Sequence, residues 1–355
     1  MRIELPISKS IANRLLILQA IHGDELMPVS DSMPDDVQIL HRALTTLKTF
    51  RTSETLSTPH INVGNCGTAM RFLTAYCAQL EGQTTILDGV ERIHHRPIGQ
   101  LVDALREIGA DIEYLGEDGF PPLRIKGCIL DKHRIVTLNN PQSTQFVSAL
   151  LLIGANVQTN STSPYITLTR AMIEQWGEDA EYISPLSGGV GGGFIERDWS
   201  SAAFWYEYVA LYGGEITLPG LSLDSLQGDK VVADIFAQLG VTTQYTEEGI
   251  RIYRSQAILN SKFLIQNFSA CPDLYPAVAL TCERLGIELH ATGVESLPLK
   301  ESDRLRAVAE HRTDADHRMA MALLVAGYEV EDTACISKSY PQFIEQWKSV
   351  NTSNE

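Results

Sequence analysis

A recurring pattern of apolar and polar positions runs along the chain, in which an amphipathic helix leads into a glycine and then into an alternating segment. It occurs around Gly109, Gly177 and Gly240, each of which stands where the end of a helix takes a left-handed residue. The glycines recur with a spacing of about 65 residues, which is too long for a common solenoid repeat. The pattern therefore predicts a repeated α/β subdomain, with a strand after each of the three helices.

Shifting this pattern by one period extends the prediction in both directions. Upstream, a helical pattern with three leucines on one face occupies residues 37–50, and downstream residues 303–310 begin another helix. No glycine and no alternating segment follow that second helix before Asp316. The connection over residues 305–316 therefore indicates either that a segment is absent here or that a naturally short loop takes its place.

The length of 355 residues predicts two domains, because a single core rarely grows that large. The glycine-rich run at residues 187–193 is the best candidate for the linker through which the chain returns from one domain to the other. We therefore expect a first domain over residues 8–197, and a second domain formed by residues 1–7 together with 198–355.

The composition and charge of the chain argue against several classes of protein. A formal net charge of −16 argues against a nucleic-acid partner, which would need a basic face. The six cysteines show no metal-ligand spacing, so they predict reduced thiols that pack as small apolar side chains. The first residues lack the apolar run of a signal peptide, and no stretch of about 18 apolar residues occurs. We expect a cytoplasmic protein without a membrane span.

Cations stand beside small hydroxyl or amide residues in several phrases that precede predicted helices. These phrases cover residues 8–14, 65–71, 300–304 and 316–319, and the stretch 140–150 adds neutral hydrogen-bonding side chains at another predicted helix start. A helix N-terminus offers free N–H groups and a partial positive charge, to which nearby Lys, Arg, Ser or Asn side chains add. Each phrase alone is also typical of a helix cap, a turn or a solvated charge. Together they predict a pocket for phosphates and carboxylates that needs no metal.

In their residue types and their order along the chain, these motifs resemble those of the EPSP synthases, the family of 3-phosphoshikimate 1-carboxyvinyltransferases. The resemblance covers most of the chain, and its most specific parts are residues 8–14, 65–71, 96–98, 300–304 and 316–321. It implies an α/β fold of two similar domains, each built from three βαβαββ repeats as an inside-out α/β barrel. It also implies an active site in the inter-domain cleft.

The resemblance further implies a reaction. Members of the family transfer the enolpyruvyl group of phosphoenolpyruvate to the 5-hydroxyl of shikimate 3-phosphate and release phosphate by addition and elimination, without a metal or cofactor. Both steps move protons, so positioned acids and bases are required. The matching catalytic residues are Lys9, Asp273, Glu301 and His317. Among these, Asp273 resembles the base near the 5-hydroxyl, and Glu301 is similar to the acid that protonates the enolpyruvyl methylene.

The family's substrate-binding positions are matched residue by residue. Those that resemble ligands of shikimate 3-phosphate are Ser10, Arg14, Ser143, Thr144, Gln145, Thr162, Tyr165, Asp273 and Lys300. Those that resemble ligands of phosphoenolpyruvate are Lys9, Asn65, Gly67, Arg96, Arg304, Arg318 and Lys338. The inhibitor glyphosate occupies the phosphoenolpyruvate site in this family, and members with alanine at the position of Gly67 resist it. The resemblance therefore implies a sensitive enzyme.

The chain departs from the family pattern at a few positions, and two alternatives stay open. Phe72 stands where many members have proline, Ser296 replaces an asparagine, and Thr162 replaces a serine. A related enolpyruvyl transferase acts on UDP-N-acetylglucosamine through a loop cysteine, but Arg96 and its neighbours follow the shikimate pattern. The other alternative is a non-catalytic paralogue that binds phosphorylated metabolites. For the favoured function we expect a monomer that binds shikimate 3-phosphate and phosphoenolpyruvate.

Overall fold

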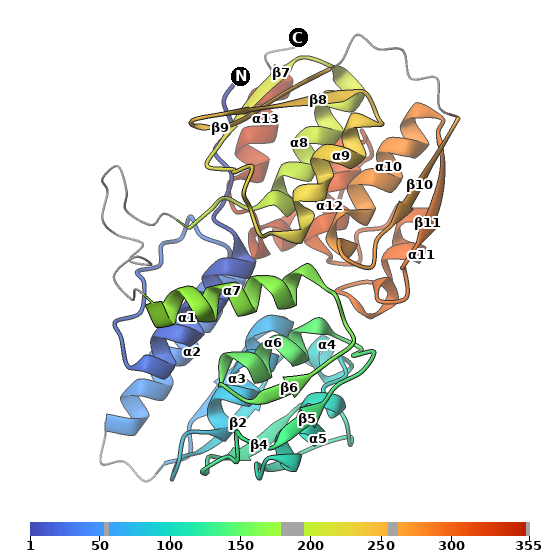
Figure 1. Ribbon diagram of the computed structural model, residues 1–355. Helices are drawn as coiled ribbons and strands as arrows, with labels where there is room; N and C mark the ends of the chain where they lie inside the picture. Colours follow the sequence, from blue (N-terminus) through green and yellow to red (C-terminus); the bar gives the residue numbers. More distant parts are fainter. Residues whose placement is uncertain (53–56, 179–194, 255–261, 353–355) are drawn as a thin grey trace. The chain divides into compact units, whose positions relative to one another are not determined.

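The computed structural model describes four stretches of the chain, residues 1–52, 57–178, 195–254 and 262–352. The chain divides into two units. Unit 1 consists of Met1–Lys9, Asp31–Asp35 and Ile195–Glu355, and unit 2 of Ser10–Ser30 and Asp36–Phe194. The chain thus starts in unit 1, builds unit 2, and returns to unit 1 near residue 195 (Figure 1).

Unit 2 opens with two helices, α1 (Lys9–His22) and α2 (Asp35–Thr52). The helix predicted over residues 37–50 is confirmed by α2, which buries Leu40, Leu44 and Leu47 along one face. The remaining elements, in chain order, are β1 (His60–Asn62), α3 (Gly67–Ala78), β2 (Thr84–Asp88), α4 (Glu91–His94), α5 (Gly99–Glu107), β3 (Asp111–Tyr114), β4 (Leu123–Lys126), β5 (Ile135–Thr137), α6 (Thr144–Leu152), β6 (Asn156–Gln158) and α7 (Pro164–Glu178).

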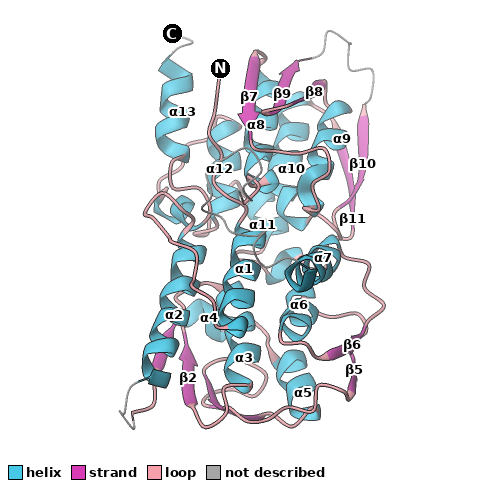
Figure 2. Ribbon diagram, turned by 60° about the vertical axis from the view of Figure 1, so that its left-hand side comes forward, coloured by secondary structure: helices cyan, strands magenta, loops and turns pink. Residues whose placement is uncertain are grey.

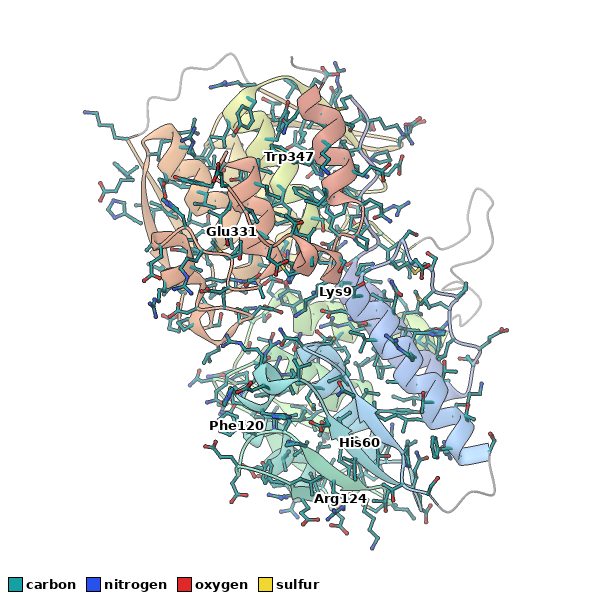
Figure 3. All side chains as sticks on the ribbon, turned by 180° about the vertical axis from the view of Figure 1, so that it is seen from behind. Lys9, His60, Phe120, Arg124, Glu331 and Trp347 are labelled. Atoms are coloured by element: carbon teal, nitrogen blue, oxygen red, sulfur yellow. The ribbon has the colours of Figure 1, made fainter. Side chains whose placement is uncertain are left out.

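A four-stranded sheet in the order β1-β2-β4-β3 forms one βαβαββ repeat of unit 2, with α3 and α5 between its strands. β1 and β2 run parallel, whereas β4 is antiparallel to both of its neighbours. On the exposed face, Arg124 of β4 (labelled in Figure 3) donates a hydrogen bond to Glu113 of β3. Gly109 has a φ of 101° between α5 and β3, as the sequence pattern predicts.

The second sheet of unit 2 pairs β5 with β6 in parallel. Helix α7 follows and runs through Gly177, so the predicted helix end at this glycine is wrong. The indole of Trp176 is buried in the last turn and packs against His22 at a ring-centroid distance of 5.5 Å, which offsets the cost of about 1 kcal/mol for a glycine inside a helix. The strand predicted after Gly177 and the run at residues 187–193 lie outside the described residues.

The elements of unit 1, in chain order, are α8 (Trp199–Tyr212), β7 (Glu215–Pro219), the 3₁₀ turn η1 (Gly228–Val231), α9 (Val232–Ala237), β8 (Val241–Thr246), β9 (Gly249–Arg254), β10 (Phe263–Asn267), η2 (Pro272–Leu274), α10 (Tyr275–Leu285), β11 (Glu288–Thr292), η3 (Leu297–Leu299), α11 (Arg304–Ala309), α12 (His317–Val325), η4 (Ala334–Lys338) and α13 (Phe343–Thr352). Gly240 has a φ of 85° between α9 and β8, as predicted. The helix predicted over residues 303–310 is confirmed by α11.

Two sheets form in unit 1, an antiparallel one in the order β7-β9-β8 and a parallel pair of β10 and β11. The first residues of the chain extend the antiparallel sheet, because Arg2 pairs in parallel with Thr217 of β7. The N-terminal nitrogen of Met1 donates to Glu215 O at 3.0 Å, and Thr217 N donates to Met1 O at 2.7 Å. The N-terminal segment is therefore bridged to β7, the edge strand of this three-stranded sheet.

Helix α8 lies at the centre of unit 1, against α9, α10 and α12 (Figure 1). It is apolar on nearly every face, a pattern typical of a helix that is surrounded by protein. Trp199, Phe204 and Trp205 are fully buried, and Trp205 Nε1 donates a hydrogen bond to Tyr340 OH at 3.1 Å. The strands of unit 1 run outside these central helices (Figure 2). Among the described helices, none has the length and apolar content needed to cross a membrane.

The connection between α11 and α12 is a tight loop. Within this described stretch no strand follows α11, and β11 pairs only with β10. His311, Asp314 and Ala315 have φ values of 51°, 46° and 56°, a region that residues with a side chain rarely adopt. The repeat built from β10, α10, β11 and α11 therefore lacks the two antiparallel strands that complete the sheet of β1 to β4.

Candidate active site

Eight titratable side chains gather in unit 1 from segments that are far apart in sequence. The 3₁₀ turn η2, the segment after η3, the starts of α11 and α12, and the end of η4 contribute them. We call this group the unit 1 cluster, and it consists of Asp273, Lys300, Glu301, Arg304, Asp316, His317, Arg318 and Lys338. The two lysines, two arginines, His317 and both predicted catalytic carboxylates were singled out from the sequence, whereas Asp316 was not assigned a role.

Arg304 occupies the centre of the unit 1 cluster and is only 1% exposed. Its Nε donates to Asp316 Oδ2 at 2.8 Å, its Nη1 to Asp273 Oδ1 at 2.7 Å, and its Nη2 to Glu301 Oε2 at 3.2 Å. Burial by itself lowers the pKa of Arg304, but the three carboxylates raise it above its usual value. One buried guanidinium therefore holds both predicted catalytic carboxylates in fixed positions.

Asp273 faces three cations. Lys300 Nζ lies 3.4 Å from its Oδ1, and Arg318 Nη2 lies 2.9 Å from its Oδ2, in addition to the contact with Arg304. Burial by itself raises the pKa of Asp273, but Arg318, Lys300 and Arg304 together hold it well below its ordinary value. The carboxyl group is therefore ionised at neutral pH.

Lys300 and Arg304 do not reach Asp273 from one helix. A spacing of four residues in the sequence predicts that both side chains share a helical face, and this prediction is wrong. Asp303 caps α11 by accepting a hydrogen bond from Arg306 N at 3.3 Å, so the helix begins at Arg304 and Lys300 lies outside it. The two side chains meet only because both point at the same carboxylate.

Glu301 lies between two cations. Lys338 Nζ donates to Glu301 Oε1 at 3.0 Å, and Arg304 holds the other carboxylate oxygen. The side chain of Glu301 is 11% exposed, so it is largely withdrawn from water without being sealed off. A carboxyl and an ammonium group, which can both exchange protons, are therefore linked by a single hydrogen bond.

His317 is buried at the start of α12. Within the described residues neither of its ring nitrogens has a hydrogen-bond partner. Burial, together with the charges of Lys9 and Arg318, lowers the pKa of His317 well below its usual value. The imidazole is therefore neutral at pH 7. Lys9, labelled in Figure 3, is the first residue of α1 and belongs to unit 1.

Two acidic residues near the unit 1 cluster were missed from the sequence. Asp229 in η1 is 2% exposed and accepts a hydrogen bond from Ser200 Oγ. Burial and the charge of Asp273 raise the pKa of Asp229 to about 7, against the opposing charge of Arg318. Asp198 caps α8 by accepting from Ser201 N at 2.9 Å. The Asp-x-Ser-Ser phrase at residues 198–201 is a helix-cap signal that would have pointed to this region.

In unit 2, Arg14 is buried and joins three helices. Its Nε donates to Thr169 Oγ1 at 2.7 Å, and its Nη2 donates to Ser148 Oγ at 3.1 Å and to Tyr165 O at 3.2 Å. Its Nη1 donates to the backbone oxygen of Ser10, one turn earlier on α1, at 2.7 Å. Burial lowers the pKa of Arg14 to about 10. Thr169 and Ser148, which the sequence did not single out, fix its orientation.

Gly67 and Arg96 lie against each other at the start of α3. A Cβ atom added at Gly67 would come within 2.5 Å of Arg96 Nη1 and 2.6 Å of its Cζ. Glycine is therefore needed here for the guanidinium to approach the helix N-terminus. Asn65 precedes the same helix, whose N-cap Cys66 accepts a hydrogen bond from Ala69 N through its Sγ at 3.3 Å.

Residues at the starts of α6 and α7 complete the predicted set. Ser143 caps α6, and its Oγ accepts from Gln145 N at 3.3 Å. Thr144 is the first residue of that helix, whereas Thr162 is exposed ahead of α7 and Tyr165 is the second residue of α7. Each unit thus presents its own share of the predicted residues at helix N-termini.

Comparison with known proteins shows which family this chain belongs to. A family model described as EPSP synthase (3-phosphoshikimate 1-carboxyvinyltransferase) matches residues 1–311 and 308–347. A 3-phosphoshikimate 1-carboxyvinyltransferase of Bacteroides fragilis is 36% identical over 394 aligned residues, covering 96% of this chain and 93% of that protein. Another from Cellvibrio japonicus is 32% identical, covering 98% of this chain and 96% of that protein.

The comparisons also bear on the fold and on the short loop after α11. An EPSP synthase structure from Acinetobacter baumannii matches 98% of this chain and 95% of its own chain with a TM-score of 0.69, at 21% sequence identity. The fold is therefore the two-domain, inside-out α/β architecture expected from the sequence. The alignment to the Bacteroides fragilis protein spans 394 positions, more than the 355 residues of this chain, so that relative has segments that this chain lacks. The two stretches of the chain that match the family model overlap at residues 308–311, within the short connection after α11.

Proposed function

The chain belongs to the EPSP synthase family, and we propose that it transfers the enolpyruvyl group of phosphoenolpyruvate to the 5-hydroxyl of shikimate 3-phosphate, with release of phosphate. One observation carries this proposal beyond the family name. Asp273 and Glu301, the two carboxylates that the reaction needs for proton transfer, are both hydrogen-bonded to the buried Arg304. Each also contacts a further cation, Lys300 or Lys338.

The addition step uses Asp273 as the base. A bond forms between the 5-oxygen of shikimate 3-phosphate and C2 of phosphoenolpyruvate, and the hydroxyl proton passes to Asp273. Its low pKa keeps it ionised and ready to accept a hydrogen bond from the hydroxyl, although a proton is held there only while the oxygen is reacting. At the same time Glu301 takes a proton from the Lys338 ammonium group to which it is hydrogen-bonded and delivers it to C3, which becomes a methyl group; the elimination step returns that proton to Lys338 by the same route.

The elimination step reverses the proton transfer at carbon. The bond between C2 and the phosphate oxygen breaks, a methyl proton returns to Glu301, and the double bond is restored. The phosphate leaves with the proton that Asp273 relayed to one of its oxygens during the addition, so the enzyme ends in its starting state. Arg318, whose Nη1 is buried without a partner among the described residues, and Lys338 supply positive charge for the departing phosphate.

We propose that His317 takes part as a neutral ring rather than as an acid, because burial and nearby cations keep it unprotonated at pH 7. Lys9 adds positive charge beside it. Unit 2 contributes binding groups: Asn65, Gly67 and Arg96 for phosphoenolpyruvate, and for shikimate 3-phosphate Ser10, Arg14, Ser143, Thr144, Gln145, Thr162 and Tyr165. Their positions at the starts of α1, α3, α6 and α7 support these assignments.

The test is release of phosphate from phosphoenolpyruvate by the purified protein, measured with and without shikimate 3-phosphate. We expect release only when both are present, and a loss of at least about 10²-fold in Asp273→Asn. Asp111→Asn, on the exposed edge of β3, is the matched control and should keep full activity. Release that depends on UDP-N-acetylglucosamine, or binding of both substrates without release, would overturn the proposal in favour of one of the two alternatives. That the protein acts as a monomer in the cytoplasm stays a prediction.

A further inference from the structure

Arg71 belongs to none of the residue sets assigned so far, although it is the last residue of the phrase around Gly67. It lies on α3 and is only 6% exposed. Its Nη1 donates a hydrogen bond of 2.6 Å to Gln145 Oε1 on α6, and its guanidinium carbon lies 5.3 Å from the centre of the Phe146 ring. A buried cation is thus directed at the side-chain amide of a predicted substrate ligand.

The amide of Gln145 is held at both ends by α3. Its Nε2 donates to Thr68 Oγ1 at 2.9 Å, and Thr68 precedes Arg71 by three residues on the same helix. An arginine has only donors, so the atom of Gln145 that faces Arg71 must be the carbonyl oxygen. The NH₂ group must therefore face Thr68, and the amide has one orientation instead of two.

This orientation determines which hydrogen atoms remain available. The NH₂ group of Gln145 has a second hydrogen that meets no partner among the described residues. The Thr68 oxygen already accepts a hydrogen bond from Gln145, so its own hydroxyl hydrogen is free to donate elsewhere. Both side chains are half-buried, so they keep some exposed surface. The pair therefore presents two donors, which is the chemistry that an anionic oxygen requires.

We propose that Arg71 is a positioning residue that sets the polarity of the Gln145–Thr68 pair, so that the pair presents only donors to a phosphate or carboxylate oxygen of a substrate. Without Arg71 the amide of Gln145 can rotate by half a turn. Its carbonyl oxygen then takes the donor's place and repels the anion. The inference rests on the proposed function, because it assumes that the bound anion is shikimate 3-phosphate or phosphoenolpyruvate.

The first experiment measures KM for each substrate, kcat, and the affinity for each substrate by calorimetry. Arg71→Met keeps the length of the side chain and its contact with Phe146 but removes the donor. We expect it to raise KM and the dissociation constant for one substrate about tenfold, with kcat changed less than about threefold. The substrate whose KM rises identifies the anion. Arg71→Lys keeps a donor-only group and should restore most of the affinity.

Arg106→Met is the matched control. Arg106 also stacks on an aromatic ring in unit 2, at 5.0 Å from the Tyr114 centre, but its hydrogen bonds go to the backbone oxygen of Ile112. The control should leave both KM values unchanged. If Arg71→Met leaves them unchanged too, or if Arg71→Lys is as impaired as Arg71→Met, the inference is wrong.

A second variant tests whether the polarity of the Gln145–Thr68 pair governs anion binding, even if Arg71→Met fails to fold. Gln145→Glu keeps the shape and gives Arg71 an even better partner, but it replaces both NH₂ donors by an acceptor oxygen. If polarity matters, Gln145→Glu should bind the anion at least tenfold more weakly than Gln145→Leu. Equal binding by these two variants would overturn the inference. Absence of turnover in the wild-type protein would instead count against the proposed function, while the calorimetric comparison would still test the polarity of the pair.

Discussion

Replacing Gly67 by alanine tests the contact between Gly67 and Arg96, which we propose to bind phosphoenolpyruvate. The added Cβ would lie 2.5, 2.6 and 2.9 Å from Nη1, Cζ and Nη2 of Arg96, whereas ordinary contacts begin at 3.4 Å. The guanidinium must therefore retreat by about 1 Å to restore a normal contact distance. Because it is the far end of a flexible side chain, the retreat costs the fold little, and we expect the melting temperature to change by less than about 3 °C.

The cost should appear in ligand binding. A charge-assisted hydrogen bond contributes about 1.5–3 kcal/mol, and moving the donor by about 1 Å removes most of it. Since 1.4 kcal/mol corresponds to a factor of ten, KM for phosphoenolpyruvate should rise by roughly 10–100-fold. The loss should be larger for glyphosate, which the family binds in the same place and which is slightly longer, so the variant should be resistant. Besides any contact between the added methyl group and the inhibitor, the structure thus predicts a displacement of Arg96.

The assay is steady-state turnover at varied phosphoenolpyruvate, with and without glyphosate, for the wild type and Gly67→Ala. Gly64→Ala cannot serve as the control, because Gly64 has a φ of 57° that strains any side chain. Gly116→Ala is suitable, since its Cβ would meet only Pro122 Cδ at 3.6 Å. Unchanged KM and unchanged inhibition in Gly67→Ala would refute the reasoning, because Arg96 would then be shown not to contact the ligand. If glyphosate inhibits neither the wild type nor Gly67→Ala, the cause would instead be Phe72, which would already have narrowed the inhibitor's space in the wild type.

Three further predictions concern the acidic residues of unit 1. Glu301→Gln should bind both substrates normally but lose at least about 10²-fold in kcat, and near-normal turnover would remove its role as a proton donor. The pKa of Asp229 is about 7 in the folded protein against an ordinary 3.8, so the fold loses stability as pH rises from about 4 to about 7. The free energy of unfolding in urea should not fall over this pH range in Asp229→Asn. The prediction is contradicted if that free energy changes with pH in the same way in the variant and the wild type. Glu207 is fully buried, has no hydrogen-bond partner among the described residues, and has its pKa raised well above normal by burial. Glu207→Met should therefore raise the free energy of unfolding at pH 8 by about 1–3 kcal/mol, and a less stable variant would disprove this reading.

Local signals explain why the starts of several helices could be predicted. Proline near Tyr275 and the acidic residue before His317 specify where α10 and α12 begin, and each signal acts within one turn of chain. The glycine pattern succeeded at Gly109 and Gly240 for the same reason. It failed at Gly177, because α7 runs through this glycine to Glu178. The neighbouring Trp176 packs against His22, a contact between residues far apart in sequence that a local pattern does not include.

The side-chain partners within the site could not be predicted, because they depend on tertiary packing. The sequence and the resemblance singled out Arg304, Asp273 and Glu301, but not that Arg304 would bind both carboxylates together with Asp316. Asp229 is 44 residues from Asp273 in sequence, and only the fold brings its charge near. Motifs reveal which groups a site contains, whereas the protonation state of each group is set by neighbours that the motifs do not include.

The pairing of the first residues with β7 has a consequence for synthesis on the ribosome. Met1 bonds to Glu215, a residue 214 positions later, and unit 2 is built almost entirely from the chain between them. At roughly 5–20 residues per second, Met1 waits about 10–40 s before its partner strand exists. Unit 2 can fold during that interval, whereas unit 1 cannot complete its sheet. The connectivity of the chain therefore allows the inserted unit to fold first, whereas the unit that holds the two proposed catalytic carboxylates can bond its first residues to β7 only afterwards.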